Sequence, residues 1–281
     1  MTGIVLEGGG LRGMFTNGIL DVFMQNGITF DALIGVSAGI LFGINYKSRQ
    51  PGRAYRYNIK YAHDKHYMSL WSLRTTGDFV NQDFAYHRLP YELDPFDFET
   101  FRQNPMPFWA VCTDIEAGKP VYHDIRDAEQ DHGLDWMRAT SSMPCFARPV
   151  EIDGHKYLDG GISDSIPLEF MHQQGYRRNV VILTQPTIYR KTQAHVGLPL
   201  RLFLHDYPKV REMMSVRHQM YNAELDYIEV SRQKGDTLII CPDQPLGIGR
   251  LEMNTDKMTA IYQQGREKAL GMLSQVRDFL Q

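Results

Sequence analysis

The sequence predicts an α/β fold around a mainly parallel central sheet, and three observations near its start carry that prediction. A short apolar run, Gly3 to Glu7, ends in glycines. A segment with helical apolar spacing follows, Met14 to Gln25, and then a second apolar run, Phe30 to Ile34. Short apolar runs without polar alternation are typical of strands buried on both faces. Strand, helix, strand is the order in which neighbouring strands of a sheet run parallel.

The remaining elements follow from the same reasoning. The first helix ends at Asn26-Gly27, a common stop signal, and Ala38 to Tyr46 is expected to be the second helix. Residues Lys47 to Pro107 are rich in aromatic and charged side chains without a clear period, and the sequence does not divide them. The further strands expected are Phe108 to Asp114, Pro120 to His123, Val180 to Thr184 and Thr237 to Cys241; the further helices are Leu134 to Ser142, Tyr207 to Arg232 and Thr255 to Phe279.

Length and charge limit the classes of protein to be considered. The 281 residues contain no repeat, low-complexity tract or linker, which favours one domain over residues 1–281. Within it, a motif-bearing core covers about residues 3–185 and a helical part covers about residues 190–281. The net charge of −3 and the lack of long basic runs argue against nucleic acid as a partner.

Cysteine spacing and the N-terminus predict a cytoplasmic location. Cys112, Cys145 and Cys241 are far apart and form no CxxC pair, which is typical of reduced thiols and not of a zinc site. The N-terminus shows no secretory leader. The stretch Ala32 to Ile44 is shorter than the ~20 residues that a spanning helix needs. We therefore expect any membrane contact to be peripheral.

The segment LIGVSAGIL, Leu33 to Leu41, interrupts an apolar run with the spacing G-x-S-x-G. At a sharp turn from a strand into a helix, a serine hydroxyl is exposed above the sheet edge, and its neighbours must be small. Gly35 and Gly39 meet that demand, so Ser37 is a candidate nucleophile at the N-terminus of a helix. The alternative is a tight turn without catalytic meaning.

The segment EGGGLRG, Glu7 to Gly13, contains a formal G-x-G-x-x-G in Gly8, Gly10 and Gly13. A dinucleotide loop would also require an acidic residue at the end of the second strand, but Asp31 precedes that strand. Beside Ser37, the backbone N–H groups of this loop would instead suit a tetrahedral oxyanion. For Arg12 two interpretations stay open, support of that oxyanion or pairing with a surface carboxylate.

A serine nucleophile needs a base, and Asp159 is placed better than any of the ten histidines. Two short strands, Pro149 to Ile152 and His155 to Leu158, are joined by Asp153-Gly154, a favoured hairpin turn. Asp159 follows directly, and Gly160 and Gly161 leave space around it. Among the histidines only His155, four residues away, stays a candidate. A turn aspartate that bonds its own backbone is the alternative for Asp159.

Taken together, EGGGLRG, GVSAG and DGG in this order resemble the patatin family of lipid acyl hydrolases. The stretch ATSSMPCFARPVEIDGHKYLDGG, from Ala139, is also similar to the family's block before its aspartate, and the resemblance spans residues 3 to about 185. It implies a three-layer α/β/α fold and a Ser-Asp dyad without histidine, metal or cofactor. By motif, Ser37 would be the nucleophile, Asp159 the base, and the backbone of Gly8, Gly9 and Gly10 with Arg12 the oxyanion site.

The expected function is therefore hydrolysis of phospholipids or other acyl-ester lipids through an acyl-enzyme. The aromatic and methionine side chains of Lys47 to Pro107, or of Phe203 to Met220, are candidates for an acyl groove or for a surface that rests on a bilayer. Two alternatives stay open. One is a catalytically silent lipid-binding or regulatory module, and the other is acyl transfer to an acceptor other than water.

Overall fold

The strands form one eight-stranded sheet in a computed structural model that describes residues 1–193 and 197–281, without the side chains of 198–199. The strand order is β5-β6-β3-β2-β1-β7-β8, and β4 pairs with β3. The strands are β1 Thr2–Leu6, β2 Ala32–Val36, β3 Phe108–Asp114, β4 Lys119–Asp124, β5 Val150–Ile152, β6 His155–Asp159, β7 Arg178–Ile182 and β8 Thr237–Ile240. The central strands β3, β2, β1, β7 and β8 are mutually parallel, whereas β4, β5 and β6 pair antiparallel.

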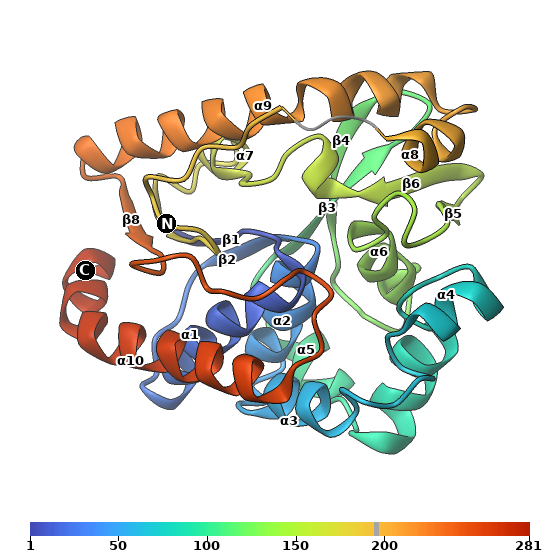
Figure 1. The fold of residues 1–281 in the computed structure, drawn as a ribbon. Helices are drawn as coiled ribbons and strands as arrows, with labels where there is room; N and C mark the ends of the chain where they lie inside the picture. Colours follow the sequence, from blue (N-terminus) through green and yellow to red (C-terminus); the bar gives the residue numbers. More distant parts are fainter. Residues whose placement is uncertain (194–196) are drawn as a thin grey trace.

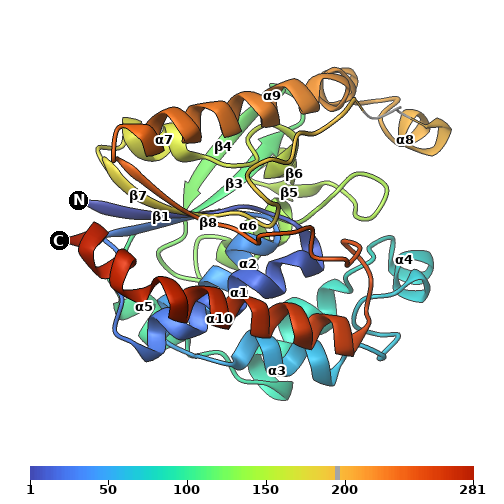
Figure 2. The ribbon, with the colours of Figure 1, turned by 60° about the vertical axis from the view of Figure 1, so that its left-hand side comes forward.

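Helices cover both faces of this sheet (Figures 1 and 2). They are α1 Met14–Gln25, α2 Ala38–Lys47, α3 Arg53–Lys60, α4 Leu70–Thr76, α5 Phe98–Gln103, α6 Gly133–Thr140, α7 Leu168–Gln173, α8 Leu198–Phe203, α9 Pro208–Gln233 and α10 Thr255–Leu280, with short 3-10 helices η1 Gly10–Gly13 and η3 Gly160–Ile162 and a π-helix η2 Asp83–Leu93. In Figure 2, α7 and α9 lie on one face, and α1, α2, α3 and α10 lie on the other. The predicted three-layer α/β/α fold with a mainly parallel sheet is confirmed.

Alternation along β1 explains why two separate cores form. Ile4 and Leu6 face the side of α1, α2 and α10, whereas Val5 faces α7 and α9. Successive residues of a strand point to opposite faces, so a strand that is apolar throughout requires a helical layer on each side. All three side chains are completely buried.

The C-terminal helix α10 packs along α1 (Figure 2). A Cβ on Gly265 would strike the main-chain oxygen of Phe15, and a Cβ on Gly18 would strike that of Tyr262. Glycine at both positions therefore allows the two backbones to approach closely. The predicted helices Tyr207 to Arg232 and Thr255 to Phe279 are confirmed, each with ends within one residue.

Two strand predictions require correction, and one hairpin prediction is confirmed in detail. The strand expected at Val180 to Thr184 is β7, Arg178–Ile182, which begins two residues earlier because Thr2, the first residue of β1, pairs with Arg178. The second strand is Ala32–Val36 instead of Phe30 to Ile34, because Ala32 is the residue that pairs with Gly3. The strand therefore ends directly before Ser37. The Asp153-Gly154 turn joins antiparallel β5 and β6 as predicted, and both residues adopt positive φ, 50° and 79°.

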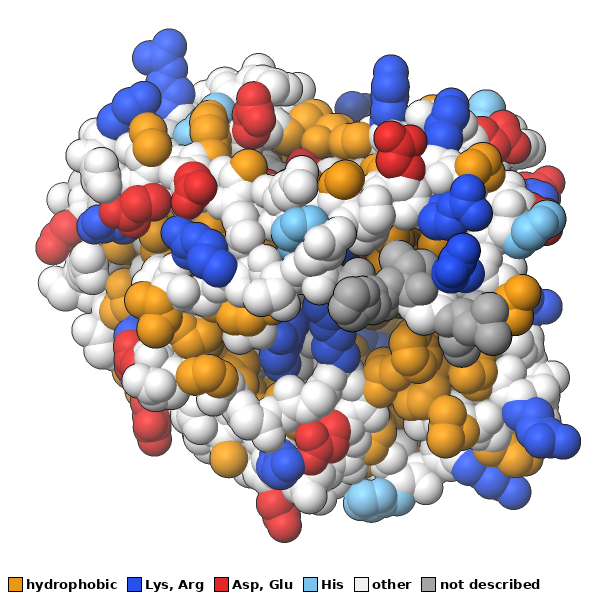
Figure 3. All heavy atoms as spheres, turned by 45° about the horizontal axis from the view of Figure 1, so that its top comes forward, with side chains coloured by type: hydrophobic (Ala, Val, Ile, Leu, Met, Phe, Trp, Pro, Cys, Tyr) orange, Lys and Arg blue, Asp and Glu red, His pale blue; other side chains and the backbone are white. Residues whose placement is uncertain are grey.

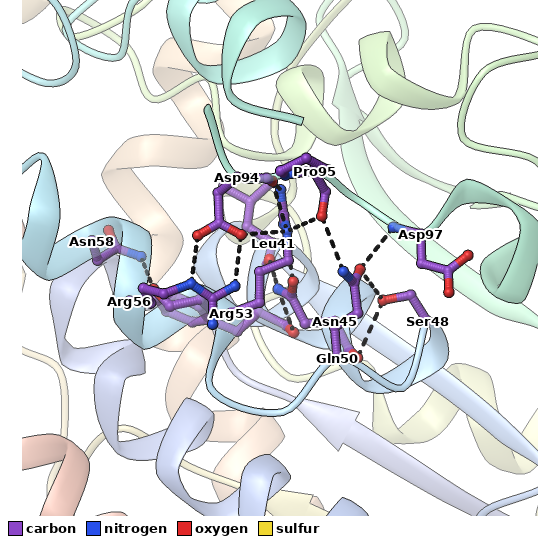
Figure 4. A network of polar contacts seen from close by, with 12 residues as sticks. Leu41, Asn45, Ser48, Gln50, Arg53, Arg56, Asn58, Asp94, Pro95 and Asp97 are labelled. Atoms are coloured by element: carbon purple, nitrogen blue, oxygen red, sulfur yellow. Dashed lines mark hydrogen bonds and ion pairs between the residues drawn. The ribbon is translucent and has the colours of Figure 1, made fainter. Parts of the chain in front are cut away.

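The segment that the sequence did not divide contains α3, α4, η2 and α5. Its anchor is Arg53, a buried residue of α3 that donates to the main-chain oxygen of Asp94 and to the side chain of Asn45 (Figure 4). Arg56 holds both carboxylate oxygens of Asp94, at 2.8 and 2.7 Å. A buried arginine satisfied in this way fixes the end of η2 against α2 and α3. No helix among the described residues is long and apolar enough to cross a membrane.

Candidate active site

Ser37 lies at the turn between β2 and α2, in a backbone conformation that residues other than glycine rarely adopt. Its φ is 53° and its ψ is −127°, and its main-chain oxygen accepts from the N–H groups of Ile40 and Leu41 in the first turn of α2. A Cβ on Gly39 would lie 2.6 Å from the main-chain oxygen of Leu6. On Gly35 it would lie 2.8 Å from the backbone nitrogen of Ile40. Both glycines of G-x-S-x-G thus permit a turn too tight for side chains.

The sheet brings Asp159 to this serine through strand β3. Antiparallel β4 pairs with β3 from Trp109 to Asp114 and therefore occupies one edge of it. Both β2, which pairs Val36 with Val111, and β6, which pairs Asp159 with Cys112, must then share the other edge. They meet there end to end, so the residue after Val36 and the last residue of β6 face one another.

The carboxyl group of Asp159 is buried, with only 2% of the residue exposed. One carboxylate oxygen accepts from the N–H of Gly161 at 2.8 Å, as a turn aspartate would. Burial raises the pKa of Asp159, against hydrogen bonds from the Ser37 side chain and the Gly161 backbone and the positive charges of Arg217 and Arg250. A carboxylate with a raised pKa is a stronger base than an ordinary aspartate.

Thr140, at the end of α6, is a residue that sequence reasoning missed. Its hydroxyl accepts from the backbone N–H of Ser37 at 3.0 Å and donates to the main-chain oxygen of Val111 at 2.5 Å. Thr140 is completely buried. It therefore fixes the backbone of Ser37 to β3, the strand that pairs with the end of β6 where Asp159 lies.

The glycine loop lies beside Ser37 and passes closely over it. A Cβ on Gly8 would lie 3.0 Å from the Cβ of Ser37, and one on Gly9 would lie 2.7 Å from the Thr184 hydroxyl. Gly10 has φ 58° and its Cβ would strike the main-chain oxygen of Arg250. Among the described residues, no main-chain or side-chain acceptor is recorded for the N–H groups of these three glycines. They are therefore able to bind an oxygen of a ligand.

The other motif glycines also make room for close packing. A Cβ on Gly13 would strike the ring of Phe42 in α2, and one on Gly160 would strike the main-chain oxygen of Val111. A Cβ on Gly161 would lie 3.1 Å from Asp159 Oδ1. These glycines allow the loop and η3 to pack against the strands that carry the serine and the aspartate.

Arg12 lines the cavity and is largely enclosed. Its Nε is buried and has no hydrogen-bond partner in the part of the chain that the structure describes. No carboxylate of the described residues is recorded within 4.0 Å of its guanidinium, so the surface pairing considered from the sequence is not seen. Burial lowers its pKa, opposed mainly by Glu7. Glu7 itself accepts from Thr184 and from the Tyr221 hydroxyl.

His155, the histidine considered as an alternative base, is exposed at the start of β6 and is not part of the cavity wall. No histidine of the described residues lines the cavity that contains Ser37 and Asp159. Among the residues that the structure describes, the serine is therefore brought together with a carboxylate and not with an imidazole.

The cavity above these two residues has a volume of about 620 Å³. Much of its wall is apolar and comes from Lys47 to Pro107, one of the two stretches expected to form an acyl groove. The apolar residues of this stretch that line the cavity include Tyr57, Tyr67, Met68, Phe79, Val80, Tyr86, Leu89, Pro90 and Phe96. From Phe203 to Met220, the other candidate stretch, only Arg217 lines it among the described residues. Figure 3 shows hydrophobic side chains around a hollow with Lys and Arg side chains inside it.

Comparisons place the chain among known proteins. The model of the patatin-like phospholipase family matches residues 4–172, and that of a domain of unknown function (DUF6363) matches residues 207–281. The uncharacterized protein YjjU of Escherichia coli is 30% identical over 190 residues, which cover 66% of this chain and 52% of YjjU. Lysophospholipase NTE1 of Meyerozyma guilliermondii is 22% identical over 262 residues, which cover 85% of this chain and 17% of that protein.

Among solved structures, VipD from Legionella pneumophila superposes with a TM-score of 0.47 and 12% identity, covering 98% of this chain and 67% of VipD. The chain spans about half the length of YjjU and less than a fifth of NTE1.

Proposed function

Because the chain belongs to the patatin-like phospholipase family, we propose that it is a carboxylic ester hydrolase that removes acyl chains from phospholipids or lysophospholipids. The observation that carries the proposal is the meeting of Ser37 with the buried Asp159 on one edge of β3, at the inner end of a largely apolar cavity. The cavity supplies the environment for an acyl chain, and the serine and carboxylate supply nucleophile and base.

In the first half of the reaction, the Ser37 hydroxyl attacks the ester carbonyl while Asp159 takes its proton. The negative charge that develops on the carbonyl oxygen is bound by backbone N–H groups of Gly8, Gly9 and Gly10, with support from the positive charge of Arg12. Loss of one such donor costs about 3 kcal/mol of transition-state stabilisation in other enzymes. Collapse of the tetrahedral intermediate expels the alcohol, which receives the proton from Asp159, and leaves the acyl group on Ser37.

In the second half, water attacks the acyl-enzyme. Asp159 takes a proton from the water, the oxyanion forms again at the same loop, and the fatty acid leaves as the proton returns to Ser37. Nothing in these steps requires a metal or a cofactor. An alcohol or thiol in place of water would make the same intermediate a transferase.

We propose that the protein reaches its substrate from the surface of a membrane. Phe146 and Leu251 are exposed and line the cavity, and Leu70 and Trp71 are exposed on nearby α4. Exposed aromatic and aliphatic side chains beside a lipid site are typical of surfaces that bind a bilayer. Co-sedimentation with phospholipid vesicles should fall for Leu70→Ser combined with Trp71→Ser; unchanged binding would argue against this surface.

Turnover is tested by incubating the protein with lysophospholipids and phospholipids and measuring the released fatty acid. We expect release by the wild type and none by Ser37→Ala with the same unfolding temperature. Acyl chains recovered on an added alcohol instead of as free acid would identify a transferase. Binding without any turnover would identify the silent lipid-binding module.

A further inference from the structure

Four cationic side chains line the cavity that contains the catalytic pair: Arg12, Lys191 and Arg217, which are half-buried, and Arg250, which is exposed. Only Arg12 belongs to a recognised motif, and the other three come from the chain after β7. Two of them, Arg217 and Arg250, fall within the region matched by the domain of unknown function. The proposed mechanism binds the oxyanion with the glycine loop and Arg12. It gives no part to Lys191, Arg217 or Arg250.

The cluster lies next to the reacting groups. A Cβ on Gly161 would be 3.1 Å from Nη2 of Arg217 and 3.1 Å from Oδ1 of Asp159, so the guanidinium and the carboxylate flank the same point. The main-chain oxygen of Arg250 accepts from the N–H of Leu11 at 3.0 Å, which attaches the segment before α10 to the glycine loop.

Contacts with α9 and with Gly161 hold two of these cations, Lys191 and Arg217, in position. Asn222 of α9 accepts from the backbone N–H of Lys191 at 2.8 Å and donates to its main-chain oxygen at 3.0 Å. The ammonium group of Lys191 then lies 3.9 Å from the centre of the Tyr221 ring. Arg217 donates through Nε to the main-chain oxygen of Gly161. Lys191 and Arg217 are therefore each held at the cavity wall by contacts of their own.

Positive charge in this region is not balanced by ion pairs. Within residues 1–193 and 197–281, no carboxylate is recorded within 4.0 Å of the charged nitrogens of any of the four side chains. The carboxylates on this part of the wall are Glu7 and Asp159. Burial, together with the neighbouring Arg217 and Arg250, lowers the pKa of Lys191 to about 7. Cations kept close together in a cavity destabilise one another unless an anion joins them.

We propose that Lys191, Arg217 and Arg250, together with Arg12, form a subsite for the phosphate group of the ester substrate, and that the preferred substrate is an acyl glycerophosphoester without a cationic headgroup. This inference rests on the proposed esterase function. It assigns to the C-terminal region a direct part in substrate binding, since three of the four ligands for the phosphate come from residues after 190. A guanidinium or ammonium group binds phosphate oxygens through charge-assisted hydrogen bonds.

The test compares lysophosphatidylglycerol with a monoacylglycerol of the same acyl chain. For the wild type we expect kcat/KM to be at least about tenfold higher for the phosphate-bearing ester, and we expect Arg217→Gln and Lys191→Gln each to lower that ratio by about tenfold. Arg217→Lys, which keeps the charge, should retain part of the preference. Arg190→Gln is the matched control, because Arg190 neighbours Lys191 but pairs with Asp226 and does not line the cavity. Unfolding temperatures identify any variant that fails to fold.

A binding arm separates this inference from the esterase proposal. Calorimetry with Ser37→Ala protein, which turns nothing over, should show tighter binding of lysophosphatidylglycerol than of the monoacylglycerol, and Lys191→Gln should remove the difference. Equal affinities for the two lipids would overturn the subsite, whether or not the wild type is an esterase. Inorganic phosphate that binds as tightly as the lipid would overturn its assignment to a lipid phosphate and identify a free-phosphate site. Tight lipid binding without turnover by the wild type would leave the subsite standing and contradict the esterase proposal.

Discussion

The hydroxyl of Thr140 accepts a hydrogen bond from the backbone N–H of Ser37 at 3.0 Å and donates one to the main-chain oxygen of Val111. Through this one side chain, α6 fixes the turn that carries the serine to the strand beside Asp159. The serine holds a φ of 53°, which is unfavourable for a residue with a side chain, so it requires such support.

Replacing Thr140 with valine keeps the shape but leaves the Ser37 N–H without its buried acceptor. A buried donor left unpaired costs about 1–3 kcal/mol, so we expect a lower free energy of unfolding and slower acylation of Ser37. Thermal unfolding and the rate of labelling by a fluorophosphonate measure the two effects. Thr140→Ser, which keeps the hydroxyl, should resemble the wild type; equal losses in both variants would mean that the hydroxyl is not what positions Ser37.

The pKa of Asp159 links activity to pH with a definite sign. Burial raises this pKa above that of an ordinary aspartate, and only the ionised form accepts a proton from Ser37. We expect kcat/KM to fall as the pH falls through the raised pKa. A rate that stays constant down to the ordinary pKa of aspartate, about 3.9, would contradict the assignment of Asp159 as the base.

Replacing Asp159 with asparagine should raise the stability of the protein although it removes the proposed base. At low pH the folded and unfolded chains both hold a protonated Asp159, so the variant and the wild type should differ little. As the pH rises from the pKa of the unfolded chain, about 3.9, to the raised pKa of the folded chain, the wild type loses stability because it must bear a buried charge; the unfolding temperature of Asp159→Asn should exceed that of the wild type by a margin that grows across this range and is constant above it. A variant less stable than the wild type at neutral pH would show that the hydrogen bonds to the carboxylate outweigh its burial.

Gly8→Ala tests the glycine loop. The new Cβ would lie 2.9 Å from the main-chain oxygen of Val36 and 3.0 Å from the Cβ of Ser37, so the loop must move away from the serine. Displacement of one oxyanion donor should lower kcat by about 100-fold. Gly271→Ala, on the open side of α10, is the control and should leave kcat unchanged while adding up to about 1 kcal/mol of stability. Similar kcat values for the two variants would argue against an oxyanion role for the loop.

Sequence reasoning was most successful where local chemistry decides the structure. The Asp153-Gly154 turn and the glycines around Ser37 are backbone requirements that few residues meet, so their positions were predictable. The aromatic segment between α2 and β3 was not, because its short helices are held by tertiary contacts such as Arg53 with Asp94. No periodicity in the sequence reports a contact between residues that far apart.

The same reason explains which site residues were missed. In the sequence, nothing distinguishes Thr140 from other helical threonines. Its contact with Ser37 exists only because α6 packs over the end of β2. Lys191, Arg217 and Arg250 are separated by more than 20 residues each and form a cluster only when α9 and the segment before α10 close over the glycine loop. That the chain is a single domain stays a prediction. Arg250 bound to Leu11 and α10 packed on α1 are the contacts that favour it.

Intact-mass analysis after exposure to a fluorophosphonate shows whether Ser37 is a nucleophile activated by Asp159. We expect one adduct on the wild type, none on Ser37→Ala, and a much slower reaction of Asp159→Asn. A folded wild type that forms no adduct, or an adduct that persists in Ser37→Ala, would rule out Ser37 as the activated nucleophile. The former result would favour a lipid-binding module without catalytic activity.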